Sequence, residues 1–89
     1  MWIRSQNNYI LANVNSLRIC KGDIDGCVYY SIHGHYDRYE QELGIYSTKE
    51  KAIEVLNYIY FIIKYADIDE VLVYEMPKDE DVEVWQKKI

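Results

Sequence analysis

The chain has 89 residues, 49% of them hydrophobic and 28% charged, and its formal net charge at pH 7 is −5. This length and composition predict one globular domain and exclude an intrinsically disordered chain. The longest apolar run covers residues 58–63 and is far shorter than the ~20 residues of a membrane-spanning helix, so we expect no membrane contact.

The acidic excess lies at the C-terminal end of the sequence. Residues 1–66 carry seven basic and seven acidic side chains, whereas residues 67–89 carry three basic and eight acidic ones. Nucleic-acid binding depends on clustered Lys and Arg, and the sequence has no such cluster, so direct nucleic-acid binding is not expected. We expect residues 1–77 to form one α+β domain and residues 78–89 to form an acidic C-terminal tail, which either aids solubility or meets a basic partner surface.

Short apolar and aromatic runs, separated by turn residues, predict strands over most of the chain. Asp25 and Gly26 form an Asp-Gly pair typical of a tight hairpin, and residues 34–38 are predicted to be a polar loop. The first predicted strand covers residues 2–4, and after a polar turn a strand resumes at residues 9–14. Further strands are predicted at residues 17–20, 27–32, 40–46 and 70–76.

Residues 48–65 carry the pattern of an amphipathic helix, with apolar side chains at helical spacing from Ala52 to Ile63. Ser47 stands three residues before Glu50, which is the spacing of a capping box, so Ser47 is the predicted N-cap. The predicted fold class is α+β. We expect an antiparallel meander sheet of about five strands with the one amphipathic helix packed on one face, in the order ββββαβ.

Cys20 and Cys27 flank the predicted hairpin and are expected to lie close together across two strands. Three interpretations are open: buried free thiols, a disulfide, or a zinc site shared with His33 or His35. Because polar residues interrupt the start of the chain before a signal-peptide core could form, we expect a cytoplasmic protein, in which a disulfide is disfavoured. The ligand spacing does not match structural zinc sites, so we expect free, metal-free thiols and two histidines in a solvated loop.

Tyrosines are the main candidates for function in the first half of the chain, because recognisable catalytic motifs are absent from the sequence. We therefore expect a protein that is not an enzyme and that uses no metal or cofactor. Tyr29, Tyr36 and Tyr39 lie around the central predicted strands and form a candidate binding surface, since tyrosine combines flat apolar area with a polar tip. The alternative is that these side chains fill the core.

The predicted helix has a second apolar side, formed by Tyr58, Phe61 and Tyr65. At 100° per residue, Phe61 lies about 180° from Ala52 on the core side. A surface helix on a monomer is normally polar at such positions. We therefore expect another subunit, a partner protein, or the C-terminal segment with Val82 and Trp85 to cover these residues.

Three segments of the sequence form a recognisable pattern: residues 1–6 (MWIRSQ), residues 43–56 (LGIYSTKEKAIEVL) and residues 73–77 (VYEMP). This pattern resembles a family of short proteins from phages and mobile elements of Gram-positive bacteria. Asn7 departs from the aspartate that follows the glutamine in that pattern, and residues 15–42 match nothing in it. The family has no established activity or catalytic residues, so the resemblance transfers no site to this chain.

The resemblance implies a biological setting, the cytoplasm of a bacterial host cell. We expect a phage accessory protein that acts by stoichiometric binding to a host or phage protein, as an inhibitor of a bacterial defence system. We also expect a homodimer. The alternatives are a protein that sequesters a small ligand such as a nucleotide, and a structural or regulatory subunit of a larger assembly.

Overall fold

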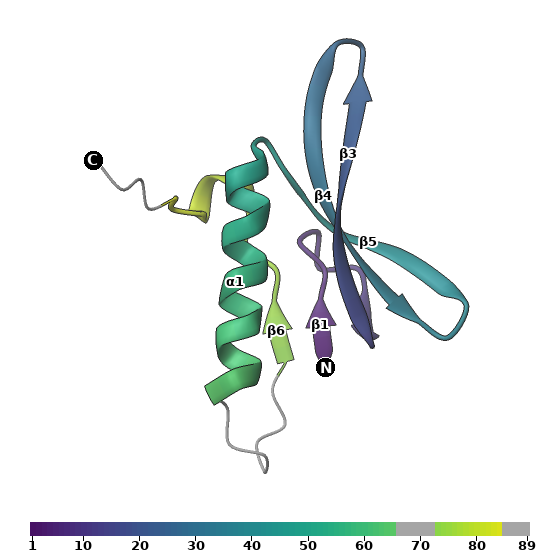
Figure 1. Cartoon of the computed structure of the whole chain (residues 1–89). Helices are drawn as coiled ribbons and strands as arrows, with labels where there is room; N and C mark the ends of the chain where they lie inside the picture. Colours follow the sequence, from purple (N-terminus) through teal and green to yellow (C-terminus); the bar gives the residue numbers. More distant parts are fainter. Residues whose placement is uncertain (66–72, 85–89) are drawn as a thin grey trace.

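The computed structural model describes residues 1–65 and 73–84 of the chain. Its elements are β1 (Trp2–Arg4), β2 (Leu11–Asn13), β3 (Ser16–Ile24), β4 (Cys27–Tyr36), β5 (Tyr39–Tyr46), α1 (Lys49–Tyr65), β6 (Val73–Glu75) and the 3-10 turn η1 (Asp79–Asp81). The predicted α+β class, with one helix packed on the strands, is confirmed (Figure 1). No helix in these two ranges is long and apolar enough to cross a membrane.

The strands form two sheets of three rather than one continuous meander. In the first sheet, β1 pairs antiparallel with β2 and parallel with β6. A parallel pair needs a crossover connection, and α1 lies in the segment between these two strands. The polar turn predicted at residues 5–8 separates β1 from β2. Ser5 closes this hairpin, since its N donates to Ile10 O at 2.8 Å and its Oγ accepts from Ile10 N at 3.0 Å.

The second sheet is an antiparallel meander of β3, β4 and β5, whose long hairpins project away from α1 in Figure 1. The predicted hairpin turn at Asp25 and Gly26 is confirmed, and both residues have positive φ, at 51° and 82°. The predicted loop over residues 34–38 is wrong, because β4 continues to Tyr36 and pairs with Tyr39 across a two-residue turn. The polar residues of this segment lie on a strand that has one solvated face.

Gln6 links the two sheets. Its backbone N donates to Leu43 O at 2.8 Å, and its side-chain amide bonds both the N and the O of Ile45 at 3.0 Å. Gln6 thus occupies the edge of β5 much as a neighbouring strand would. The same amide donates to Pro77 O at 3.1 Å, as does the hydroxyl of Tyr46 at 2.8 Å. Burial raises the pKa of Tyr46 well above its ordinary value.

The core lies between α1 and both sheets. Its buried side chains are Ile3, Ala12, Val14, Ile32, Leu43, Tyr46, Ala52, Val55, Ile59 and Met76. Gly34 on β4 is required at the centre of this core. A Cβ there would lie 2.5 Å from Cγ1 of Val14 and 2.8 Å from Cδ1 of Leu43, closer than side chains pack.

The start of α1 departs from the prediction by one residue. Thr48 is the N-cap, since its Oγ1 accepts from Lys51 N at 3.2 Å, and the predicted N-cap Ser47 is wrong. Ser47 instead donates through its N and its Oγ to Oδ1 of Asp79, at 2.8 and 3.0 Å. The acceptor for Ser47, the Asp79 carboxylate, comes from a segment distant in sequence, so the local spacing of residues 47–50 does not reveal it. Burial raises the pKa of the Asp79 carboxyl, but the hydrogen bonds from Ser47, followed by the charge of Lys51, outweigh it and lower that pKa.

Candidate functional site

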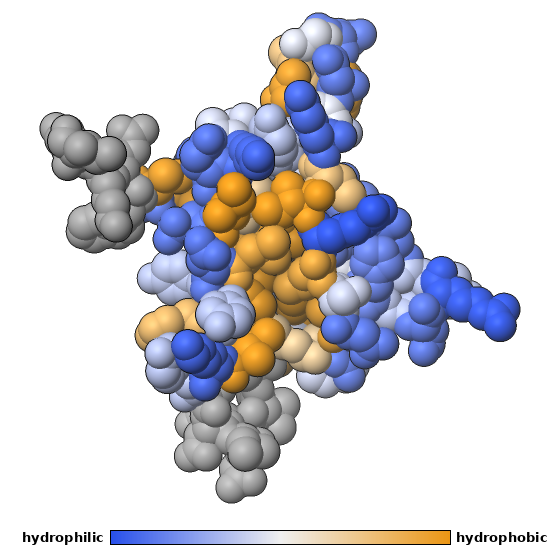
Figure 2. All heavy atoms as spheres, in the orientation of Figure 1, coloured by the Kyte–Doolittle hydropathy of each residue, from blue (hydrophilic) through white to orange (hydrophobic). Residues whose placement is uncertain are grey.

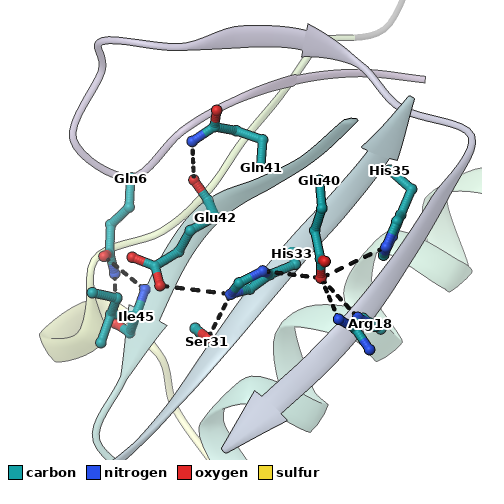
Figure 3. Close-up of polar contacts among 9 residues, drawn as sticks. All are labelled: Gln6, Arg18, Ser31, His33, His35, Glu40, Gln41, Glu42 and Ile45. Atoms are coloured by element: carbon teal, nitrogen blue, oxygen red, sulfur yellow. Dashed lines mark hydrogen bonds and ion pairs between the residues drawn. The ribbon is translucent and has the colours of Figure 1, made fainter. Parts of the chain in front are cut away.

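The face of the second sheet that points away from the core carries a cluster of polar side chains (Figure 3). Ile32 and Gly34 of β4 are buried, so alternation along the strand turns Ser31, His33 and His35 to the other face. Residues of β3 and β5 stand opposite these side chains. We call the set the polar cluster, and it comprises Arg18, Cys20, Ser31, His33, His35, Glu40 and Glu42.

Glu40 lies at the centre of the polar cluster. Its Oε1 is 2.8 Å from Nε of Arg18, 3.1 Å from Nδ1 of His33 and 3.6 Å from Nε2 of His35. The hydrogen bond from Arg18 is the largest reason that the pKa of Glu40 lies below its ordinary value, and the nearby positive charges add to it. One carboxylate therefore serves three nitrogen-bearing side chains from two neighbouring strands.

His33 connects Glu40 to Ser31. Its Nε2 lies 2.9 Å from Ser31 Oγ, and its Nδ1 faces Glu40, which is the order of a Ser-His-acid relay. Two features argue against acyl transfer at this point. Ser31 is only 2% exposed, and β4 is the central strand, whose amides face β3 and β5 rather than a bound substrate.

The two cysteines do not lie opposite each other, so their predicted proximity is wrong. Cys20 pairs with Ser31 and Cys27 pairs with Ile24, because the hairpin is longer than the predicted one. Both cysteines have free thiols. Cys20 instead lies beside His33 and Glu40: one ligand atom of each, drawn from three neighbouring strands, lies within 4.8 Å of the others.

The three tyrosines of the first candidate binding surface do not form one surface. Tyr36 and Tyr39 lie at the turn between β4 and β5, with ring centroids 5.9 Å apart and planes tilted by 34°. Tyr29 is near the other end of β4, half-buried and opposite Gly22 on β3. The rings of Tyr36 and Tyr39 pack on each other, so they do not form two parallel walls for a nucleobase.

The second aromatic set lies on α1 and faces outward. Tyr58, Phe61 and Tyr65 are 60–64% exposed, and the rings of Phe61 and Tyr65 are 4.6 Å apart. Tyr58 borders a depression of about 290 Å³ that is also lined by Val82. Val82 packs against the core, while Trp85, the other expected anchor, lies outside the described residues. Among the described residues, the C-terminal segment thus approaches Tyr58 and leaves Phe61 and Tyr65 exposed.

A groove of about 630 Å³ runs along the other side of α1, and sequence reasoning missed it. Figure 2 shows apolar side chains gathered over α1 and the strands beside it. The groove combines the N-terminal end of the chain with the second half of the helix, so no single segment indicates it. Its apolar walls include Met1, Val14, Leu17, Leu56, Tyr60 and Ile63.

Searches against protein-family models, curated proteins and solved structures found no match to this chain. Proposals about its function therefore rest on the geometry of the described residues and on the pattern of residues 1–6, 43–56 and 73–77. Of the two aromatic sets, the one on α1 exposes all three of its side chains by 60–64% each.

Proposed function

We propose that the protein is not an enzyme and acts by stoichiometric binding, through the apolar surface of α1. One observation carries this proposal: the helix exposes six large apolar side chains by 39–64% each, namely Ile53, Tyr58, Tyr60, Phe61, Ile63 and Tyr65. A helix on the surface of a monomer normally turns polar side chains to water. Exposed large apolar side chains that gather on one helix mark sites of association.

The outer helix face, formed by Tyr58, Phe61 and Tyr65, binds the same face of a second copy of the chain. A twofold axis lets one such patch cover its own copy. An antiparallel helix pair centred on Phe61 would bring Tyr58 of each copy to Lys64 and Tyr65 of the other, so that the aromatic patch covers itself. This self-complementary register favours a second copy as the occupant of this face.

The groove on the other side of α1 binds a different protein. Tyr60 and Ile63 project beside it and are 64% and 62% exposed, so an apolar segment of a partner can bury them. The resemblance of residues 1–6 and 43–56 to phage proteins supports a component of a bacterial defence system as that partner, in the cytoplasm of the host cell. The net charge of −5 favours a partner with a basic surface around the contact.

A second candidate function is the sequestration of a small molecule in the same groove. Its volume of about 630 Å³ lies in the size range of ligand sites, roughly 300–1,000 Å³. The residues that line it include no Lys or Arg, so an uncharged apolar ligand suits it better than a nucleotide. Native mass spectrometry of the purified protein tests this candidate, because a retained ligand adds its own mass.

Capture from a bacterial lysate, followed by reconstitution from purified components, tests the protein-binding proposal. We expect the wild type to retain one host protein at a one-to-one ratio. The Ile63→Glu variant should not retain that protein. Ile24→Glu is the matched control, because Ile24 is 63% exposed at the tip of the β3–β4 hairpin, away from α1. Equal retention by both variants would contradict binding through the groove.

A further inference from the structure

Cys20, His33 and Glu40 bring a thiol, an imidazole and a carboxylate together on the outward face of the meander sheet. They come from β3, β4 and β5 respectively, and one ligand atom of each lies within 4.8 Å of the others. The side chains of His33 and Glu40 are 22% and 34% exposed, so the cluster is open to an ion from solvent. Thiolate, imidazole and carboxylate together form a ligand set suited to Zn²⁺.

The surroundings of His33 match those of a metal-ligating histidine. Nδ1 faces Glu40 Oε1 at 3.1 Å, while Nε2 lies 2.9 Å from Ser31 Oγ and 3.6 Å from Glu42 Oε2. When Nδ1 binds an ion, Nε2 carries the proton and donates it to Ser31, with the Glu42 carboxylate beside it. Such outer contacts fix the tautomer and the orientation of a ligating ring.

His35 lies beside this ligand set without belonging to it, because the group whose ligand atoms all lie within 4.8 Å of one another is Cys20, His33 and Glu40. The Nε2 of His35 lies 3.6 Å from Glu40 Oε1, on the same face as His33 and two residues further along β4. Its Nδ1 is buried and has no hydrogen-bond partner within the part of the chain that the structure describes.

Arg18 competes with an ion for Glu40. Its guanidinium donates to Oε1 at 2.8 Å and neutralises the carboxylate that a metal would use. The Arg18 side chain is 58% exposed, so it can turn into solvent when an ion binds. This competition makes a specific prediction, because removing Arg18 should strengthen metal binding.

We propose that Cys20, His33 and Glu40 form a zinc site that ties the three strands of the meander together and leaves a fourth position open to solvent. The proposal replaces the expectation of metal-free cysteines, because the register of the three strands brings Glu40 beside Cys20 and His33. The site lies on the sheet face away from the core and is independent of the apolar surface of α1. Zinc bound only by the folded chain stabilises the fold.

Titration of the reduced, full-length protein with Co²⁺ tests the site, because Co²⁺ takes the same ligands as Zn²⁺ and is coloured. We expect one Co²⁺ per chain, a thiolate-to-cobalt charge-transfer band, and displacement by one equivalent of Zn²⁺. Cys20→Ser should abolish the band and weaken Zn²⁺ binding by at least about tenfold, while the matched variant Cys27→Ser leaves both unchanged. Arg18→Gln should bind several times more tightly than the wild type.

A second measurement on the wild type makes the test independent of whether a variant folds. Zn²⁺ should slow alkylation of Cys20 in the native protein and leave the rate at Cys27 unchanged, as mass spectrometry of the labelled peptides reports. The proposal is overturned by a wild type that shows no thiolate band with Co²⁺, or by equal protection of the two cysteines. A band that survives Cys20→Ser and disappears in Cys27→Ser overturns it as well.

Discussion

Asp79 joins the C-terminal segment to the start of α1. Its carboxylate accepts both hydrogen bonds that Ser47 donates, while Lys51 Nζ donates to the Asp79 carbonyl oxygen at 2.9 Å. Thr48 performs the separate task of capping the helix. Two adjacent hydroxyl residues thus stabilise the same helix end by different contacts, which denaturation experiments can separate.

A double-mutant cycle distinguishes these two roles. Thr48→Ala should lower the free energy of unfolding by about 1 kcal/mol whether or not Asp79 is present, because the cap is local. Ser47→Ala should cost about 1 kcal/mol in the wild type and nearly nothing in Asp79→Ala, because its partner is then already gone. Urea denaturation of the single and double variants measures both couplings. Additive effects of Ser47→Ala and Asp79→Ala would contradict the observed pairing.

The ionisation of Asp79 makes its contribution depend on pH. Its pKa in the folded protein lies below the ordinary value of 3.8, so the unfolded chain takes up the proton first as pH falls. The contribution is therefore complete well above pH 3.8 and is lost as pH falls through the folded-state pKa. Denaturation of wild type and Asp79→Asn should show a difference at pH 6 that shrinks toward about pH 3. A difference that grows at low pH would contradict the assignment.

At the scale of single elements, β4 carries the largest constraint. It is the central strand of the meander, and it presents Gly34 to the core between Val14 and Leu43. A methyl group at this position has no space unless the side chains of Val14 and Leu43 move. Ile32 and Gly34 of β4 face the core, while Ser31, His33 and His35 alternate with them on the other face, so β4 contributes to both the core and the polar cluster.

Gly34→Ala should therefore lower the free energy of unfolding by about 1–3 kcal/mol through overpacking. In the Val14→Ala background, Gly34→Ala should lower the free energy of unfolding by less, because the smaller side chain at position 14 leaves room for the new methyl group. Urea denaturation of the four proteins measures this coupling. Equal costs of Gly34→Ala in the two backgrounds would show that the close approach to Val14 does not limit the site.

Elements with local sequence patterns could be predicted, and contacts between distant segments could not. The helix predicted over residues 48–65 is present from Lys49 to Tyr65, the last residue described before position 73, and the Asp-Gly turn lies where its composition places it, since both depend on neighbouring residues. The continuation of β4 through His35 was missed because polar residues on a solvated strand face resemble a loop. The proximity of Cys20 to Glu40 depends on the register of three strands, which sequence spacing alone does not determine.

At the scale of the whole molecule, the parallel pairing of β1 with β6 organises the fold. It closes the first sheet, whose buried residues share one core with α1 and the second sheet, and one side of the helix faces outward (Figure 1). The groove beside α1 and the outer helix face follow from this arrangement. The sequence indicated the outer face through Phe61, whereas the groove depends on tertiary packing.

The solution mass of the protein, measured by light scattering, tests most directly whether the exposed face of α1 is an interface. We expect the wild type to have twice the mass of the chain, and Phe61→Glu to have the mass of a single chain with its fold intact. Ile24→Glu, which places the same charge at a side chain of similar exposure, should remain a dimer. A wild-type protein that is monomeric at high micromolar concentration would contradict the proposed interface.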